Sequence, residues 1–98
     1  MSRAFGRRRM STEIELFYSP YCGRCAVARR RLRALLCGPV YGNLAYRERN
    51  VLEHLERAVD LGVTATPALA IGGQLVAAGS WQERRLRALL AASVREGG

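Results

Sequence analysis

The sequence contains no lysine: all sixteen of its basic residues are arginines, against eight acids, which gives a formal net charge of +8. A basic balance of this size favours acidic proteins, nucleic acid or an anionic membrane surface, without choosing among them. Four of the arginines lie in the first twelve residues, which contain no acid: Arg3, Arg7, Arg8 and Arg9. We expect residues 1–12 to form a disordered basic arm before a single folded domain at 13–96.

Long hydrophobic runs are also missing. No stretch of about 18 apolar residues is present, so we expect no membrane-spanning helix. The residues after Arg9 are polar, whereas a secretory signal requires an apolar stretch of about 7–15 residues. We therefore expect a cytoplasmic protein with no membrane partner. In that compartment paired thiols are more often catalytic or metal-binding than structural.

What the sequence does contain is typical of one globular domain. Its 98 residues are 49% hydrophobic and 24% charged, which excludes wholesale disorder and repeat architectures. Hydrophobic periodicity and turn signals predict an α/β domain in the order β-α-β-α-β-β-α. The expected strands are 13–18, 44–49, 68–71 and 75–78, with a Gly72-Gly73 hairpin between the last two.

Three helices are predicted between these strands. The first runs over 23–36 and buries Ala28, Leu32, Leu35 and Leu36. The second begins at Asn50, an N-cap with Glu53 as its capping-box partner, and ends at Leu61 before Gly62. We expect it to bury Leu52, Leu55 and Val59. The third is capped by Ser80 with Glu83 and turns a leucine-rich face inward, formed by Leu86, Leu89, Leu90 and Val94.

The chemistry of the sequence concentrates at Cys22-Gly-Arg-Cys25, where a strand ends and a helix begins. A helix N-terminus favours an anion, and the thiolate is the nucleophile, so Cys22 should be activated there. Cys25 lies one turn further on and can resolve a mixed disulfide. Arg24 adds positive charge beside the thiolate. The alternative is a zinc site, but only Cys37 and His54 remain as further ligands, and Cys37 lies ~18 Å from Cys25 along a continuous helix. We expect no metal.

Two segments resemble the thioredoxin superfamily in its short, glutaredoxin-sized form. Ile14–Cys25 is similar to the strand and active-site turn of glutaredoxins, and Gly62–Gly73 resembles the cis-proline segment and hairpin. The resemblance implies a thioredoxin-like fold, a four-stranded mixed sheet with helices on both faces. It also implies that Pro67 is cis and faces the cysteines, and that Thr66 offers its backbone to an extended substrate.

The sequence departs from the superfamily in four respects. The extra strand and helix that precede the active-site strand in full thioredoxins have no counterpart among the twelve residues before Glu13. The buried acid that thioredoxins carry six residues before the first cysteine is replaced by Leu16, and their tryptophan before that cysteine is replaced by Tyr21. The acid with which glutaredoxins hold glutathione is absent from Ala78–Trp81. These departures favour dithiol exchange with protein substrates.

Together these features indicate a thiol–disulfide oxidoreductase that reduces disulfide-containing proteins. Cys22 would be the nucleophile and Cys25 the resolving thiol, with a redox-active Cys22–Cys25 disulfide and with Tyr21, Arg24, Thr66 and Pro67 contacting the substrate. We expect a monomer that needs no cofactor, with glutathione kept as an alternative co-substrate. A thioredoxin-reductase-like enzyme or glutathione would be the reductant.

The alternative is a non-catalytic binding module on the same scaffold. Its arginine-rich arm and first helix would recruit an acidic protein, or nucleic acid, which we consider the less expected partner. The default interpretation of Arg29, Arg30, Arg31 and Arg33 is a solvated helix face. Outside the site, we expect Cys37 to be half-buried, His54 to be a surface or boundary residue and Trp81 to cover the sheet edge.

Overall fold

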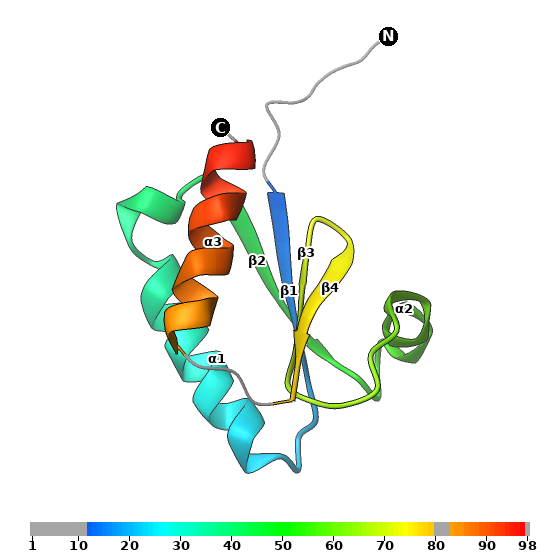
Figure 1. Cartoon of the computed structure of the whole chain (residues 1–98). Coiled ribbons are helices and arrows are strands. Elements are labelled where there is room, and N and C mark those ends of the chain that lie inside the picture. Colours follow the sequence, from blue (N-terminus) through cyan, green and yellow to red (C-terminus); the bar gives the residue numbers. More distant parts are fainter. Residues whose placement is uncertain (1–11, 80–82, 98) are drawn as a thin grey trace, which may run out of the picture.

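The computed structural model describes residues 12–79 and 83–97 (Figure 1). Four strands form one sheet in the order β2-β1-β3-β4. They are β1 Thr12–Tyr18, β2 Leu44–Asn50, β3 Ala68–Ile71 and β4 Gln74–Ala78. β1 pairs parallel with β2 and antiparallel with β3, and β3 and β4 form a hairpin. The predicted mixed sheet and element order are therefore confirmed.

Helices cover both faces of this sheet, as expected (Figure 1). They are α1 Gly23–Leu36, α2 Leu55–Leu61 and α3 Glu83–Gly97, with a short 3-10 turn η1 at Pro39–Tyr41. α1 and α3 pack on one face and α2 on the other. Because successive side chains of a strand point to opposite faces, central β1 contributes Leu16 to the α1/α3 core and Phe17 to the α2 core.

The α1/α3 core follows the predicted helix faces closely. Leu32 in α1 and Leu86 and Leu90 in α3 are almost fully buried, and they surround Leu16 of β1. The hairpin between β3 and β4 also forms as predicted, since Gly72 and Gly73 both adopt positive φ angles of 59° and 82°. A side chain would be strained at both positions. The sequence pattern was sufficient for this half of the domain.

The second helix differs from its prediction. Asn50 is the last residue of β2, and the ladder continues as the Val51 amide donates to the Tyr18 carbonyl at 2.9 Å. The Asn50 side chain accepts from the Leu52 amide at 2.9 Å and so caps a turn, not a helix. The helix starts only at Leu55, with His54 as N-cap. The capping box predicted with Glu53 is therefore wrong, whereas Gly62 ends the helix as expected, with φ at 86°.

The late start of α2 changes which side chains are buried. Ala58 is the buried residue of the helix. Leu52, Leu55 and Val59 are 65%, 62% and 69% exposed, so the prediction that they form the inward face is wrong. The short helix packs on the sheet through its small Ala58 side chain and the half-buried Leu61, whereas Leu55 and Val59 point outward.

The first strand begins one residue earlier than expected. Thr12, expected in the arm, is the first residue of β1 and pairs with Leu44. Residues 1–11 and the predicted cap Ser80 with Trp81 lie outside the described residues. Within 12–79 and 83–97, no helix combines the length and the apolar character that crossing a membrane requires.

A buried carboxylate ties α2 to the sheet. Glu15 in β1 has no exposed surface and accepts hydrogen bonds from Arg49 of β2 at 2.6 Å and from Arg57 of α2 at 2.8 Å. Burial alone would raise the pKa of Glu15, but the Arg57 and Arg49 guanidinium groups together hold that pKa below its ordinary value. A lone buried carboxylate would be costly, whereas this one is paired on two sides.

We predict that Glu15→Gln lowers the free energy of unfolding by about 2 kcal/mol at pH 7, near the low end for charge-assisted bonds because Arg57 is partly exposed. Since the folded-state pKa of Glu15 is lowered, its contribution is present above the unfolded pKa of about 4.3 and is lost as pH falls through the folded value. Urea unfolding at pH 7 and pH 3 measures both effects.

Glu13→Gln is the matched control, because Glu13 pairs with Arg47 on the same strands but is partly exposed. We expect it to cost less than about 1 kcal/mol. Equal losses for the two variants, or a Glu15→Gln loss that is the same at both pH values, would contradict this account of Glu15.

Candidate active site

Cys22 is the N-cap residue of α1, one short turn after β1 ends at Tyr18. Its amide donates to the Ser19 carbonyl at 3.2 Å, and its Sγ accepts from the Cys25 amide at 3.2 Å. The sulfur thus takes the place that a serine or aspartate oxygen usually has at a helix N-terminus. Within the first turn of α1 no acidic residue is present, so the free amides and the helix dipole act on the sulfur.

The two cysteines differ in exposure and in acidity. Cys22 is half-buried, whereas Cys25 is 1% exposed and its Sγ accepts from the Ser19 amide at 3.5 Å. Hydrogen bonding from the Cys25 thiol, and then from the Cys25 and Arg24 amides, lowers the pKa of Cys22. Burial raises the pKa of the Cys25 thiol. Near neutral pH the Cys22 thiol is therefore deprotonated more readily, whereas the Cys25 thiol keeps its proton up to a higher pH.

The segment with Pro67 lies against this pair. The Thr66–Pro67 peptide bond is cis, as the resemblance implied. The Thr66 carbonyl oxygen lies 3.9 Å from the Cys22 Sγ, although the two residues are far apart in the sequence. Pro67 is buried, and its carbonyl accepts from the Gly79 amide at 2.8 Å, which connects the segment to the end of β4. The structure thus brings together Cys22, Cys25, Thr66 and Pro67.

The other two predicted substrate contacts flank Cys22 on the surface. Tyr21 is 90% exposed. Arg24 is exposed in the first turn of α1, and its backbone amide is among the groups that lower the pKa of Cys22. The contribution of Arg24 to the lowered pKa of Cys22 thus comes from its backbone amide, whereas the sequence analysis had added the charge of its side chain.

A cluster that sequence reasoning missed packs α1 against β2 close to the site. Glu48 accepts from Arg33 at 2.7 Å, from Arg29 at 3.3 Å and from the Tyr46 hydroxyl at 2.8 Å. The Arg29 guanidinium also lies 4.1 Å from the ring centroid of Tyr18, the last residue of β1. Arg33 is the first cause of the lowered pKa of Glu48. The sequence feature that could have indicated this cluster is Glu48, a single acid between Arg47 and Arg49 in β2.

The predicted solvated arginine face on α1 is confirmed for Arg30, Arg31 and Arg33, which are exposed, whereas Arg29 is half-buried in this cluster. Arg29 and Arg33 share Glu48. The positive charge that α1 offers to a partner is therefore smaller than its sequence suggests.

The remaining candidate ligands lie elsewhere. Cys37 is exposed at the C-cap of α1, where its thiol donates to the Ala34 carbonyl at 3.2 Å, so the expectation of a half-buried Cys37 is wrong. Because α1 is continuous from Gly23 to Leu36, Cys37 lies ~18 Å along the axis from Cys25. His54 is half-buried at the start of α2. Among residues 12–79 and 83–97, no three His, Cys, Asp or Glu side chains gather as metal ligands would.

Neither a protein-family model nor a curated protein matches the chain by sequence. Solved structures do match its shape. The thioredoxin of Malassezia sympodialis superposes with a TM-score of 0.75 at 18% identity, over 86% of this chain and 76% of that one. A mutant thioredoxin of Halobacterium salinarum gives 0.71 at 22% identity, over 87% and 76%. The oxidized mitochondrial thioredoxin 3 of Saccharomyces cerevisiae gives 0.71 at 23%, over 85% and 79%.

These similarities show that the chain has the thioredoxin fold. At such identities the likeness concerns the fold, and one fold hosts many functions. What the chain does must be argued from its own site.

We predict that iodoacetamide labels Cys22 faster than Cys25 in the fully reduced protein at pH 7, because Cys22 has the lowered pKa and the more exposed sulfur. Peptide mapping by mass spectrometry after short exposure measures the order. Cys37 is exposed at the C-cap of α1, away from the Cys22–Cys25 pair, so it serves as the internal reference for accessibility. Faster labelling of Cys25 than of Cys22 would reverse the assignment.

A second prediction concerns Arg24. Arg24→Ala keeps the backbone amide that contributes to the lowered pKa of Cys22, so that pKa should rise by well under one unit, since an exposed charge at contact distance is worth only about 1 kcal/mol in water. Thiolate absorbance against pH gives the value. Arg30→Ala, one of the exposed arginines further along α1, is the control and should leave the pKa unchanged. A rise of more than one unit on Arg24→Ala would show that the side chain dominates.

Proposed function

We propose that the protein is a thiol–disulfide oxidoreductase that reduces disulfides in protein substrates. The observation that carries the proposal is the asymmetry of the cysteine pair: the Cys22 sulfur caps α1 beside the Thr66 carbonyl, and Cys25 lies buried directly behind it. A partly exposed sulfur with a lowered pKa and an inner sulfur with a raised one are suited to two successive steps, attack and release.

In the first step, the Cys22 thiolate attacks one sulfur of the substrate disulfide. A bond forms between Cys22 and that sulfur, the substrate S–S bond breaks, and the second substrate sulfur leaves as a thiolate that takes a proton from solvent. In the second step, Cys25 loses its proton and attacks the Cys22 sulfur. The Cys22–Cys25 disulfide forms, and the first substrate sulfur leaves as a thiolate that is then protonated. Two electrons have moved from the protein to the substrate.

The surface around Cys22 suits an extended protein segment. The backbone of Thr66 lies beside the reacting sulfur, and Pro67 shapes the segment that presents it. Tyr21, the residue before Cys22, offers an exposed aromatic side chain. We propose that the substrate passes between Tyr21 and Thr66, so that its disulfide meets the Cys22 sulfur end-on.

The cycle requires an external reductant but no bound cofactor, because the electrons reside on the two thiols of the chain. A dithiol reductase of the thioredoxin-reductase class fits this exchange, with glutathione as the alternative. The reducing cytoplasm is the setting that we propose, and a monomer is sufficient, because both cysteines and Thr66 come from one chain.

The competing proposal of a purely binding module has weaker support. It rests on the arginine-rich arm, which lies outside the described residues, and on α1, where Arg29 and Arg33 are held by Glu48. A binding module also has no need for two cysteines at one helix end whose pKa values are shifted in opposite directions.

The test is the reduction of insulin disulfides in the presence of dithiothreitol. Cys22→Ser should remove the catalysed rate. Pre-reduced Cys25→Ser, mixed with insulin after the dithiothreitol has been removed, should retain attack and accumulate a mixed disulfide with the substrate, visible by non-reducing electrophoresis and mass spectrometry. Cys37→Ser is the matched control and should keep at least about half of the parent rate, since its thiol lies ~18 Å from the pair.

A folded parent protein with no rate above dithiothreitol alone would rule out the reductase. A loss in Cys37→Ser as large as that in Cys22→Ser, with the circular dichroism spectrum unchanged, would show that the wrong pair of cysteines has been assigned.

A further inference from the structure

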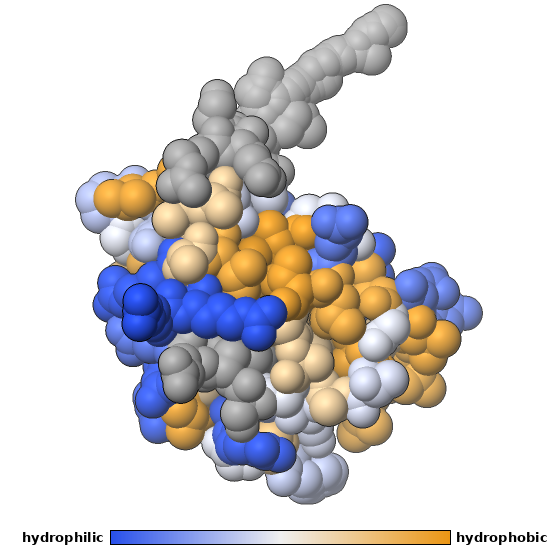
Figure 2. Space-filling view, in the orientation of Figure 1, coloured by the Kyte–Doolittle hydropathy of each residue, from blue (hydrophilic) through white to orange (hydrophobic). Residues whose placement is uncertain are grey.

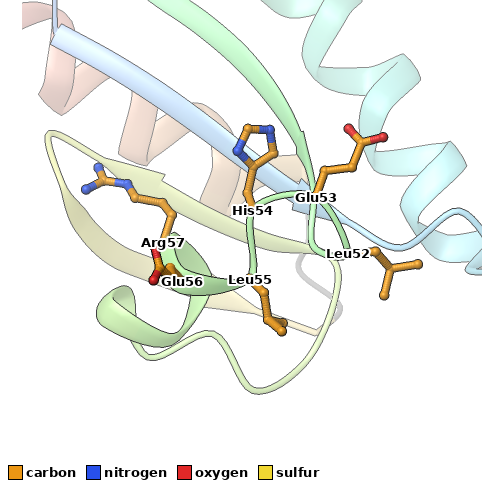
Figure 3. A pocket seen from close by; sticks show the side chains of 6 residues that line it. All are labelled: Leu52, Glu53, His54, Leu55, Glu56 and Arg57. Carbon is orange, nitrogen blue, oxygen red and sulfur yellow. The ribbon is translucent and has the colours of Figure 1, made fainter.

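An apolar surface remains uncovered on α2 and the turn before it. Leu52, Leu55 and Val59 are three of the few large hydrophobic side chains that are exposed in the described chain. Figure 2 shows hydrophobic surface at the right of the view, in the region that α2 occupies in Figure 1. In Figure 3, Leu52 and Leu55 project outward from the ribbon. A surface formed by three neighbouring aliphatic side chains is typical of a docking site.

The same surface is hollowed. One depression of about 360 Å³ is lined by residues 52–57, and a second of about 240 Å³ is lined by Leu55, Glu56, Val59 and Asp60. Leu55 and Glu56 belong to both depressions, so the two are adjacent. Each is large enough to accept part of a leucine- or phenylalanine-sized side chain from a partner.

The acids on this surface outnumber its one arginine, Arg57, which lines the first depression and is paired with the buried Glu15. Glu53, Glu56 and Asp60 flank the apolar side chains, and none of the three forms an ion pair with any side chain that the structure describes. The other acids with described side chains are all paired with arginine: Glu13, Glu15, Glu48 and Glu83. We call Leu52, Glu53, Leu55, Glu56, Val59 and Asp60 the α2 face.

We propose that the α2 face docks a basic segment with large apolar side chains in the substrate protein. This inference rests on the proposed function. The apolar side chains would enter the two depressions while Arg or Lys side chains pair with Glu53, Glu56 and Asp60. A neutral or acidic segment would leave these three carboxylates unpaired at the interface.

The position of the α2 face fits a role in presenting the disulfide. α2 ends at Leu61, and the chain then runs directly through Gly62 to Thr66, whose carbonyl lies beside the Cys22 sulfur. Five extended residues span at most about 18 Å, which is less than the width of a standard protein interface of about 800 Å² per partner. One substrate protein can therefore cover the α2 face and Cys22 at the same time.

The position of α2 is fixed, so the docking surface is preformed. Arg57 donates from α2 to the buried Glu15 of β1 at 2.8 Å, and Ala58 packs against Phe17 in the core. A preformed surface loses little conformational entropy when the partner binds.

The first test measures binding without redox chemistry. The probe is a fluorescent amphipathic peptide of leucine and arginine, and its partner probe has every arginine replaced by glutamate. The full chain should bind the arginine peptide and not the glutamate peptide. The triple variant Glu53→Gln/Glu56→Gln/Asp60→Asn should weaken binding about tenfold, as three exposed ion pairs of modest strength imply. Leu55→Ser/Val59→Ser should weaken it by a similar factor.

Two control variants match these changes elsewhere on the surface. Glu83→Gln removes an acid of α3 that is already paired with Arg87, and Val40→Ser removes an exposed aliphatic side chain of η1. Both should bind the arginine peptide as the parent does. Equal binding by all variants would overturn the proposal, because the peptide would then be held by another surface.

The second test connects the face to catalysis. A disulfide peptide that carries the arginine–leucine segment should be reduced with a lower KM than the same peptide with the glutamate–leucine segment, at an unchanged kcat. In the triple variant the two KM values should become equal, whereas reduction of the untagged peptide stays at the parent rate. If no disulfide is reduced by any form, the proposed function fails, and the binding test still decides the α2 face.

Two other occupants would each overturn the proposal. If the chain self-associates in sedimentation experiments and the triple variant does not, the face is occupied by a second copy. If a chain that lacks residues 1–11 binds the arginine peptide at least about tenfold more tightly than the full chain, a difference of about 1.4 kcal/mol, the arm with its four arginines competes for the face. The occupant then belongs to the chain itself. A monomeric chain with the same affinity in both lengths supports a substrate segment.

Discussion

The turn that joins β1 to α1 is the constraint on which the site depends. Ser19 is hydrogen-bonded to both cysteines, since its carbonyl accepts from the Cys22 amide and its amide donates to the Cys25 sulfur. β1 is the central strand, buried on both faces, so the end of this strand cannot shift. The position of the Cys22 sulfur at the helix N-terminus, and with it the difference in acidity between the two thiols, follows from where the strand stops.

The few acids of this basic protein are used mainly to assemble the sheet and its helices. Glu15 connects β1 to β2 and α2, and Glu48 connects β2 to α1 and, through Arg29, to Tyr18. Each carboxylate thereby engages two arginines, which would otherwise repel each other. The acids of α2 take no part in this assembly. The surface consequently has an acidic apolar region on one helix and a basic region on α1, and a partner protein would meet two surfaces of opposite sign.

The sequence predicted a structural feature correctly where one local pattern determined it, and failed where a contact with a distant part of the chain competed with that pattern. Leu32, Leu86 and Leu90 are buried as their spacing predicts, because nothing competes with an amphipathic face. Asn50 carried a good capping signal, but it also completes the parallel ladder with β1, and sheet pairing prevailed over the cap. Ion pairs between residues distant in the sequence, such as Glu15 with Arg57, leave no periodic trace at all. At the site, the cysteine spacing and the resemblance were sufficient to place Cys22, Cys25 and Pro67, whereas Glu48 required the folded chain.

Glu15 and Leu16 show why a buried acid near the cysteines need not serve them. The thioredoxin pattern leads to position 16, where this chain has a leucine packed in the α1/α3 core. The buried acid is one residue earlier, and adjacent residues of a strand face opposite sides of the sheet. Glu15 therefore lies on the α2 side, held by two guanidinium groups that keep it ionised and occupied. Glu15 therefore does not lie on the sheet face that α1 covers, and its carboxylate is not free to accept a proton. In the exchange that we propose, deprotonation of Cys25, whose pKa burial raises, would then fall to solvent or to the departing substrate thiolate.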